Sequence, residues 1–305
     1  LVAVVFCGCH SYQPTSITVA SYNLRNANGS DSAKGNGWGQ RYPVIAKMVQ
    51  YHDFDIFGTQ ECFIHQLKDM KEALPGYDYI GVGRDDGKEK GEHSAIFYRT
   101  DKFDVIEKGD FWLSETPDVP SKGWDAVLPR ICSWGHFKCK DTGFEFLFFN
   151  LHMDHIGKKA RVESAFLVQD KMKELGKGKE LPAILTGDFN VDQTHQSYDA
   201  FVSKGVLCDS YEKAGFRYAI NGTFNDFDPN SFTESRIDHI FVSPSFQVKR
   251  YGVLTDTYRS IVGKGEKKQA NDCPEEIDIK TYQARTPSDH FPVKVELEFD
   301  QRQQK

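Results

Sequence analysis

Residues 181–192 read LPAILTGDFNVD, and this stretch decides how the rest of the chain is interpreted. Its segment 182–186 is short, apolar and partly β-branched, which favours one buried strand. Asp188 and Asn190 follow the strand, and alternate residues of an extended segment point the same way. Both side chains are therefore expected to project together from the strand's end. A carboxylate beside a carboxamide suits water, metal or phosphate, although Gly, Asp and Asn are also ordinary turn formers.

The composition is that of a globular protein without a broad basic surface. The 305 residues are 39% hydrophobic, 13% aromatic and 27% charged, with a formal net charge of −6. These values exclude a largely disordered chain. Proteins that hold duplex nucleic acid mainly through its phosphates usually carry more Lys and Arg. The seven cysteines show no paired spacing suited to zinc, and no disulfide framework is indicated.

The first nine residues are apolar and resemble the end of a signal peptide. Residues 6–9 read FCGC, similar to a bacterial lipobox in which Cys9 becomes the lipidated first residue. We therefore expect a signal remnant at 1–9, a short connecting segment at 10–16, and a lipid anchor that attaches the protein to a membrane. The protein would then be a periplasmic or surface lipoprotein of the cell envelope, and otherwise secreted. The alternative is an ordinary buried first strand.

Short apolar strands recur along the rest of the chain, with helices between them. We expect strands at 17–24, 55–58, 77–83, 94–99, 103–113, 130–140, 144–151, 182–186, 237–243, 247–255 and 291–299, and helices near 44–49, 159–175 and 198–204. No repeat or linker divides them, which predicts one α+β domain over 17–300, followed by a tail at 301–305. The excess of strands over helices favours two packed sheets with helices outside.

Most of the buried strands end in a polar cluster. The residues at these endings are Asn23, Glu61, His152, Asp188 with Asn190, Asp238 with His239, and Asp289 with His290. One such ending is a cap or a turn. Six endings, each with an acid, amide or imidazole, predict a single polar pocket at one end of the sheets.

The motifs at these endings are, in chain order, SYNLR, TQE, NLHMDH, TGDFN, RIDHIFVS and SDHFPV. In order and spacing they resemble the endonuclease/exonuclease/phosphatase superfamily of deoxyribonuclease I-like enzymes. GVGRDDG and FWLSETPD resemble local features of an uncharacterised bacterial branch. The resemblance covers about residues 17–299. It implies a four-layer α/β sandwich, with two packed, mostly antiparallel sheets flanked by helices, and a metal-dependent hydrolase acting on phosphoric ester bonds.

The resemblance also implies a metal site and a nucleophile site. Glu61 would be the principal ligand of Mg²⁺, or alternatively Mn²⁺, with Asn23 and Asp289 near it, and hard oxygen donors suit these ions. Asp188 would orient and deprotonate the attacking water. Asn190 would donate hydrogen bonds to the phosphoryl group.

Two imidazoles complete the implied catalytic set. His152 and His290 would donate hydrogen bonds to phosphate oxygens and stabilise developing charge. Each imidazole would be held by a carboxylate, which fixes its tautomer. Asp238 is the expected partner of His290, and Glu92 the expected partner of His152. Two further histidines beside the motifs are expected to be structural, His155 and His239.

These roles predict in-line hydrolysis of a P–O bond. A phosphodiester substrate, either nucleic acid or a phospholipid head group, is slightly favoured. The alternative is a phosphomonoesterase that closes around a small sugar or inositol phosphate and grips its terminal phosphate with arginines. The candidates for that grip are Arg25, Arg84, Arg130 and Arg161. An alternative of another class is an inactive, surface-displayed binding lipoprotein. No protein partner is implied, and we expect a monomer.

Overall fold

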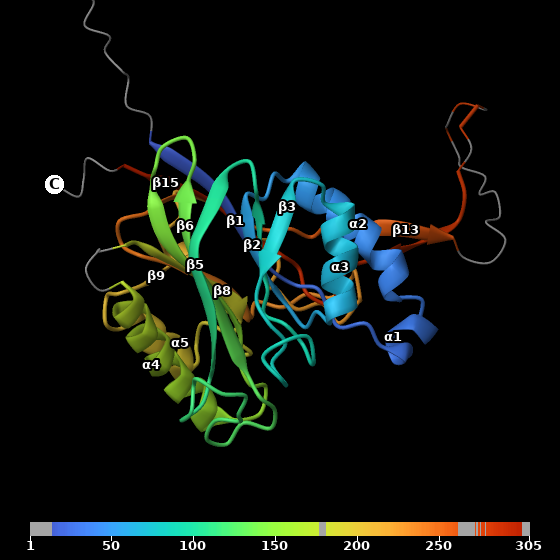
Figure 1. Ribbon diagram of the computed structural model, residues 1–305. Helices are drawn as coiled ribbons and strands as arrows, with labels where there is room; N and C mark the ends of the chain where they lie inside the picture. The colour runs from blue at the N-terminus through green and yellow to red at the C-terminus, as the bar shows by residue number, and fades with distance from the viewer. Residues whose placement is uncertain are drawn as a thin grey trace, which may run out of the picture.

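Two β-sheets packed face to face form the centre of the computed structural model, with helices on both outer sides (Figure 1). The structure describes residues 14–176, 181–261, 272, 274, 276, 277 and 279–300. The expected signal remnant at 1–9, the lipid anchor at Cys9 and the tail at 301–305 lie outside the described residues. Membrane attachment therefore stays a prediction. None of the described helices is both long and apolar enough to cross a membrane.

The first sheet has seven strands in the order β10-β12-β15-β1-β2-β4-β3. Its strands are β1 (Thr15–Asn23), β2 (Ile56–Gln60), β3 (Tyr77–Ile80), β4 (Ile96–Arg99), β10 (Phe216–Tyr218), β12 (Gln247–Val253) and β15 (Val293–Phe299). β1 begins two residues before the expected start of the domain, because Thr15 and Ser16 already pair with β15. Thr15 lies opposite Phe299 in this antiparallel pair. Both ends of the described chain therefore meet at the same end of the central strands.

The second sheet has six strands in the order β5-β6-β7-β8-β11-β9. Its strands are β5 (Phe103–Trp112), β6 (Ile131–Cys139), β7 (Glu145–His152), β8 (Ala183–Asp188), β9 (Cys208–Asp209) and β11 (Asp238–Val242). Most pairs in the two sheets are antiparallel, and the parallel ones are β1–β2, β7–β8 and β10–β12. A separate two-stranded ribbon, β13 (Tyr258–Ile261) with β14 (Tyr282–Arg285), projects from the body (Figure 1).

The helices cover the outer faces of the sheets and complete the four layers. They are α1 (Gly29–Ala33), α2 (Trp38–Tyr51), α3 (Ile64–Ala73), α4 (Lys158–Leu175), α5 (Gln196–Val202) and α6 (Ser210–Lys213). α2 and α3 share one apolar cluster with the outward side chains of β1 and β2. α4 and α5 share another with those of β7 and β8. The expected four-layer sandwich of mostly antiparallel sheets is therefore confirmed.

Each expected strand and helix is present, with shifted ends. α2 begins at Trp38 and contains Pro43, whereas the sequence predicted a helix that starts behind this proline. α3 and the β13–β14 ribbon were not expected. β7 is buried from its second residue to its last, which is typical of a strand covered on both faces.

Side chains alternate between the two faces of each central strand, so every second side chain points into the space between the sheets. In β1, Val19 belongs to the core between the sheets, whereas Tyr22 faces the helices. In β8, Ile184 belongs to the same inter-sheet core. Because every second side chain lies on the same face, Asn23 and Asp188 at the strand ends also point into the space between the sheets.

A layer of polar side chains separates the apolar core from this end of the sheets. The Asn150 amide oxygen accepts hydrogen bonds from Gln60 at 2.7 Å and from Thr186 at 3.0 Å. Its amide nitrogen donates to the carbonyl of Thr59 at 2.8 Å. A Cβ on Gly58 would clash with the side-chain oxygens of Asn150 and Thr186, so β2 requires glycine where it faces β7 and β8.

Candidate active site

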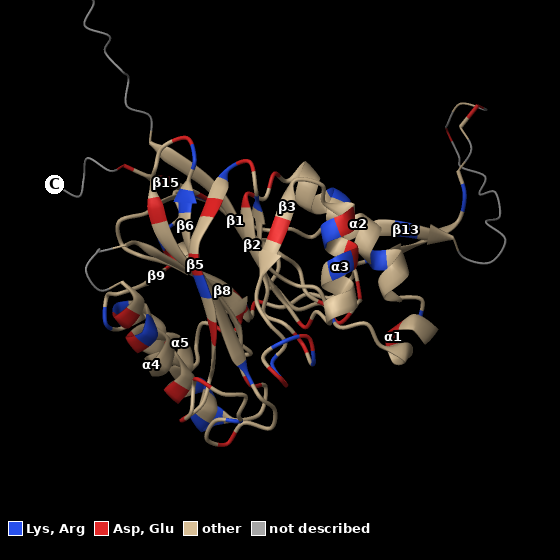
Figure 2. Ribbon diagram, in the orientation of Figure 1, with Lys and Arg blue, Asp and Glu red and all other residues tan. Residues whose placement is uncertain are grey.

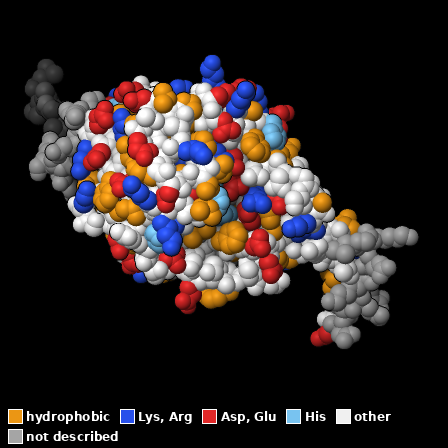
Figure 3. All heavy atoms as spheres, turned by 90° about the horizontal axis from the view of Figure 1, so that it is seen from below, with side chains coloured by type: hydrophobic (Ala, Val, Ile, Leu, Met, Phe, Trp, Pro, Cys, Tyr) orange, Lys and Arg blue, Asp and Glu red, His pale blue; other side chains and the backbone are white. Residues whose placement is uncertain are grey.

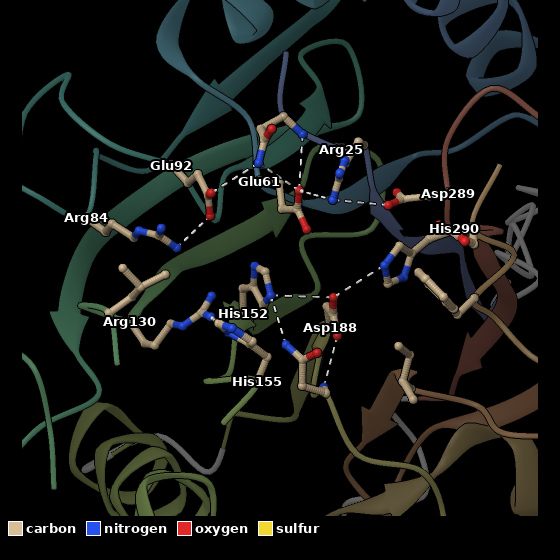
Figure 4. Close-up of a pocket in the computed structure, with 16 residues that line it drawn as sticks. Arg25, Glu61, Arg84, Glu92, Arg130, His152, His155, Asp188, Asp289 and His290 are labelled. Carbon is tan, nitrogen blue, oxygen red and sulfur yellow. Dashed lines mark hydrogen bonds and ion pairs between the residues drawn. The ribbon is translucent and has the colours of Figure 1, made fainter. Parts of the chain in front are cut away.

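The polar strand ends meet in one cavity of about 470 Å³ at one end of the two sheets (Figure 4). The parallel pair β7–β8 sets His152 beside Asp188, and the antiparallel pair β8–β11 sets Asp188 beside Asp238. These three side chains form a row on the inner face of the second sheet. Figure 3 shows the hollow from outside, with charged and histidine side chains gathered in it and hydrophobic side chains beside it.

Most of the residues predicted from the sequence line this cavity. Those that do are Arg25, Glu61, Arg84, Glu92, Arg130, His152, Asp188, Asn190, Asp289 and His290. Asn23 and Asp238 lie directly behind the lining and contact it through hydrogen bonds. Arg161 does not line the cavity. The structure therefore brings together side chains from both sheets that are far apart in the sequence.

The Asn23 amide joins the two sheets at the floor of the cavity. Its nitrogen donates to Glu61 Oε1 and to Asp188 Oδ2, at 3.0 Å each. Its oxygen accepts from the backbone N–H of Arg25 at 2.9 Å. The second oxygen of Glu61 accepts from the backbone and the side chain of Asn26, at 3.2 Å each. Asn23 thus fixes a carboxylate of one sheet relative to a carboxylate of the other.

Glu61, Asp188 and His290 are arranged so that they could hold a metal ion. Each offers one ligand atom, and these atoms lie within 4.8 Å of one another. The sequence predicted Asn23 and Asp289 beside Glu61 instead. In the structure the Asn23 oxygen is already bonded to a backbone N–H, and the Asp289 carboxylate is paired with Arg25 Nη1 at 3.3 Å.

The expected pair of His290 and Asp238 is present. His290 Nδ1 lies 2.8 Å from Asp238 Oδ2, and Nε2 lies 3.8 Å from Asp188 Oδ2. Burial by itself would lower the pKa of His290. The carboxylates of Asp238 and Asp188 outweigh burial and raise this pKa well above its ordinary value. His290 is therefore a cationic hydrogen-bond donor aimed at the cavity.

Asp188 is a buried carboxylate whose proton affinity suits a base. Burial first, and then the neighbouring Asp238 carboxylate, raise the pKa of Asp188 to about 7. Its Oδ1 accepts from the backbone N–H of Asn190 at 2.9 Å. A carboxylate whose pKa is close to neutral accepts a proton from water more readily than an ordinary one.

His152 is a neutral ring in this arrangement. Burial first, and then the guanidinium groups of Arg130 and Arg84, hold the pKa of His152 well below its ordinary value. The Asn190 amide nitrogen lies 3.0 Å from His152 Nε2 and also donates to the Met153 carbonyl at 2.9 Å. With that nitrogen as the donor, Nε2 accepts and the ring proton is on Nδ1, although the same Nε2 also lies 3.5 Å from Asp188 Oδ2. Donation from His152 to phosphate, as the sequence predicted, requires the proton to move to Nε2.

The predicted pairing of Glu92 with His152 is wrong. Glu92 Oε2 instead accepts from Arg84 Nη1 at 2.6 Å, and Oε1 accepts from Asn26 at 3.4 Å. Among the described residues, His152 Nδ1 has no hydrogen-bond partner. The guanidinium of Arg84 takes the carboxylate because a charged donor binds it more strongly than a neutral imidazole does.

Arg84 and Arg130 lie side by side along one wall of the cavity (Figure 4). Both are buried, with 9% and 4% of their surface exposed. Arg130 Nε pairs with Asp154 at 3.3 Å, and Nη2 lies 2.9 Å from His155 Nδ1. Within the described part of the chain, Arg84 Nε and Arg130 Nη1 have no hydrogen-bond partner. Each guanidinium group therefore has one nitrogen, itself shielded from solvent, that no described protein group satisfies.

The other two arginines predicted to bind substrate have different surroundings. Arg25 Nε pairs with Asp31 at 2.9 Å, and its Nη1 reaches toward Asp289 across the cavity. Arg161 donates to the backbone carbonyl of Asp154 at 2.9 Å. Arg161 therefore supports the loop below Arg130 from behind, and a direct contact with substrate is not available to it.

Strained backbone is concentrated at the cavity. Four non-glycine lining residues have left-handed φ values: Arg25 at 57°, Glu61 at 66°, Asn190 at 50° and Asp226 at 51°. Such conformations cost about 1–3 kcal/mol each and persist where the surrounding structure holds them. Their gathering here supports a functional role for the cavity.

Several lining residues were not predicted. Asn26, Phe224 and Asp226 line the cavity. Asn26 directly follows the motif SYNLR, whereas the other two come from a loop without any periodic signal. His155 also lines the cavity, although the sequence assigned it a structural position. His239 is buried and bonded to a backbone carbonyl, as expected.

Comparison with known proteins agrees with this geometry. The sequence profile described as Endonuclease/Exonuclease/phosphatase family matches residues 20–290. A mannosyl-6-phosphatase from Bacteroides thetaiotaomicron VPI-5482 is 86% identical, with a TM-score of 0.87 and coverage of 93% of this chain and 100% of that chain. An endonuclease/exonuclease/phosphatase from Bacteroides vulgatus is 37% identical, with a TM-score of 0.79 and coverage of 94% and 100%. An uncharacterised protein of Acanthamoeba polyphaga mimivirus is 30% identical over 276 residues, which is 86% of this chain and 92% of that protein.

Proposed function

The chain belongs to the endonuclease/exonuclease/phosphatase family of phosphoesterases, and we propose that it is a divalent-metal-dependent phosphomonoesterase acting on the 6-phosphate of a mannosyl residue. The 86% identity to a mannosyl-6-phosphatase along that protein's whole length supports this substrate class. The reaction is hydrolysis of a P–O bond, which releases inorganic phosphate and a sugar hydroxyl.

The paired arginines in the cavity wall are the observation that carries the choice of a monoester. A phosphomonoester carries nearly two negative charges at neutral pH, whereas a diester carries one. Arg84 and Arg130 are buried and line the cavity, and each has one N–H group without a hydrogen-bond partner among the described residues. Guanidinium groups bind a terminal phosphate through charge-assisted hydrogen bonds. A cavity of about 470 Å³ also suits a small ester.

The phosphodiester substrate slightly favoured by the sequence receives less support. Lys and Arg are scattered among Asp and Glu over the ribbon and do not gather along one face (Figure 2). The cavity lining carries the five carboxylates of Glu61, Glu92, Asp188, Asp226 and Asp289. An extended polyanion would be repelled by such a rim, because nucleic acids are bound through basic tracks. The alternative of an inactive binding protein conflicts with the complete set of acids, amides and imidazoles in one cavity.

The donor set fits a hard divalent cation. The five lining carboxylates face only three guanidinium groups, those of Arg25, Arg84 and Arg130. An anionic substrate would enter such a site only if further positive charge were present. Glu61 would be the principal ligand of the ion, with the Asp188 carboxylate beside it, and carboxylate oxygens favour Mg²⁺ or Mn²⁺. The bound ion would neutralise charge on the phosphoryl oxygens.

The protein's own groups account for the remaining steps. Asp188 accepts a proton from the attacking water, a role consistent with its pKa of about 7. His290, held by Asp238 at 2.8 Å, donates to a phosphoryl oxygen. Arg84 and Arg130 bind the other phosphoryl oxygens and orient phosphorus toward Asp188. Asn23 keeps Asp188 and Glu61 in place during the attack.

Steady-state kinetics on matched substrates test the proposal. With Mg²⁺ present, we expect mannose 6-phosphate to be hydrolysed with a kcat/KM at least about 100-fold above that for bis(p-nitrophenyl) phosphate or plasmid DNA. A diester would leave buried polar groups of the site without a partner, and such a loss discriminates strongly between substrates. Glucose 6-phosphate, which differs at one hydroxyl, measures sugar selectivity. Faster cleavage of either diester than of both sugar phosphates would overturn the assignment.

A further inference from the structure

The segment 223–226 presents alternate side chains to the mouth of the cavity. Thr223 and Asn225 are buried, at 0% and 1% exposure. Phe224 is 40% exposed and Asp226 is exposed, and both line the cavity. Residues 223–225 alternate as an extended segment does, and Asp226 then begins a turn with its backbone in the left-handed region.

The segment is anchored directly to the chain that carries His290. Phe224 and His290 form an antiparallel backbone bridge. The backbone N–H of Asn225 donates to the Asp289 carbonyl at 2.7 Å, and that of Phe291 donates to the Thr223 carbonyl at 2.6 Å. A displacement of the segment would therefore displace a residue of the candidate metal site.

The buried side chains fix the segment from below. Thr223 Oγ1 accepts from the backbone N–H groups of Ile237 and Asp238, at 2.9 and 3.0 Å. Asn225 Oδ1 accepts from the N–H of Phe227 at 2.9 Å and from the Thr286 hydroxyl at 3.0 Å. Phe224 and Asp226 are thus held at the mouth before any ligand arrives.

Phe224 provides an apolar surface beside the reacting groups. Its ring meets His290 edge to face, with centroids 5.2 Å apart. Leu128 and Ile237 are the other apolar side chains among the described lining. The carbon-bound hydrogens of a sugar ring form an apolar face, which packs on an aromatic ring while the hydroxyl groups point sideways.

Asp226 has no evident role in phosphate chemistry. Its carboxylate has no hydrogen-bond or ion-pair partner among the residues that the structure describes, and its backbone is in the left-handed region, with φ at 51°. A negative charge at the entrance disfavours phosphate. A carboxylate accepts strong hydrogen bonds from hydroxyl groups, so its place at the rim suits the alcohol part of the ester.

We propose that Phe224 and Asp226 form a recognition rim for the sugar part of the substrate, with Phe224 packed on one face of the hexose and Asp226 accepting hydrogen bonds from ring hydroxyls. This inference rests on the proposed function. It adds two specificity-determining residues that do not touch the phosphate. The Asp226 charge also disfavours esters that carry a second phosphate.

The test compares mannose 6-phosphate with ethyl phosphate, which releases a primary alcohol but lacks the hydroxylated ring. In Phe224→Ala and in Asp226→Ala, the ratio of kcat/KM for mannose 6-phosphate to that for ethyl phosphate should fall at least about 10-fold, mainly through KM. A displacement of His290 that slows the hydrolysis of both substrates equally does not change this ratio. Phe224→Tyr keeps the ring and should keep the ratio within about twofold.

Phe232→Ala is the matched control. Phe232 belongs to the same loop and is 70% exposed, but it lines a different cavity, so the ratio should not change. If the unmodified protein cleaves mannose 6-phosphate and the ratio is unaltered in both alanine variants, the rim is excluded and the proposed function stands. If the unmodified protein does not cleave mannose 6-phosphate while it cleaves ethyl phosphate, the proposed substrate class fails, and the rim with it.

Discussion

A single amide, that of Asn23, holds carboxylates from both sheets at hydrogen-bond distance, and three residues near it have shifted pKa values. Burial and the Asp238 carboxylate raise the pKa of Asp188 to about 7. Against burial, the neighbouring carboxylates raise the pKa of His290, whereas burial lowers the pKa of His152. Substitutions at this scale should therefore act on turnover before they act on stability.

Asp188→Asn is expected to lower turnover of mannose 6-phosphate at least about 100-fold. The replacement keeps the size of the side chain but removes the group that accepts the proton of water. Steady-state kinetics give the turnover, and thermal denaturation verifies that the variant remains folded. Near-normal turnover in a folded variant would contradict the role given to this carboxylate.

Arg130→Gln is expected to lower kcat/KM for mannose 6-phosphate by about 10- to 100-fold, and to lower it less for a diester, because the lost charge matches the second charge of the monoester. Stability should change little, since Asp154 keeps hydrogen bonds from the backbone N–H groups of Ile156 and Gly157. Parallel kinetics on both substrates measure the difference. Equal losses on the two would exclude monoester recognition by this arginine.

At the scale of elements, the close approach of β2 to β7 and β8 sets the floor of the site. Gly58 lies against Asn150 and Thr186, and the hydrogen bond from Gln60 to Asn150 crosses between the sheets at 2.7 Å. This polar layer connects the apolar core to Asn23 and its partners. A change in the distance between the sheets should therefore alter both the stability of the fold and the positions of the strand ends.

Gly58→Ala is expected to reduce the free energy of unfolding by about 1–3 kcal/mol, because its Cβ would meet the side chains of two strands. Gly39→Ala is the matched control. Gly39 lies in α2 with nothing within 4 Å of an added Cβ, so alanine there should be neutral or slightly stabilising. Urea denaturation measures both. Equal stability of the two variants would contradict the tight packing at Gly58.

Several elements of the fold could be predicted from the sequence alone. The alternation in β1 and the short apolar runs of β7 and β8 are local properties of the sequence, so these strands and the polar residues at their ends could be predicted. The pairing of Asp238 with His290 followed from the family motifs. These parts depend on short stretches of chain, or on motifs whose arrangement is known from relatives.

The contacts that could not be predicted are those in which residues from distant parts of the chain compete for the same partner. Glu92 could be expected to bind His152 only if no stronger donor lay closer, and the loop that carries Arg84 brings one. Phe224 and Asp226 lie in a loop whose conformation depends on hydrogen bonds to distant residues. No periodic sequence pattern indicates such a loop. The β13–β14 ribbon pairs two polar strands, whose pattern resembles that of an ordinary loop.

For the whole molecule, the buried histidine His239 makes the stability of the fold depend on pH. His239 is 1% exposed and packs against the rings of Phe189, Tyr198 and Phe241. Burial lowers the pKa of His239. The unfolded chain, with a histidine pKa of about 6.5, therefore binds the proton first as the pH falls. The contribution of this residue is complete above about pH 6.5 and is lost progressively below it.

His239→Phe is expected to remove up to about 2 kcal/mol of the stability loss between pH 7 and pH 5. The aromatic substitute keeps the ring contacts but has no proton to bind. Unfolding free energies from urea titrations at several pH values give the comparison with the unmodified protein. Parallel pH curves for the two proteins would show that His239 is protonated equally in the folded and unfolded states.

Cation binding should stabilise the whole fold. A ligand present at 100 times its Kd stabilises the folded state by about 2.7 kcal/mol, so Mg²⁺ or Mn²⁺ should raise Tm by several degrees. Glu61→Gln should abolish the rise. A chelator should remove both the rise and the hydrolysis of mannose 6-phosphate. An unchanged Tm over millimolar concentrations of both ions would exclude the proposed metal site.

The pairing of Thr15 with Phe299 has a practical consequence. Asn23 lies eight residues farther along β1, so at about 3.3 Å per residue Thr15 and its partner Phe299 are about 26 Å from the cavity floor. A bead, a fusion partner or a surface coating coupled at this end of β1 and β15 therefore leaves the mouth open toward the bulk solution. The immobilised protein should accept bulky phosphorylated glycans as readily as the free one does.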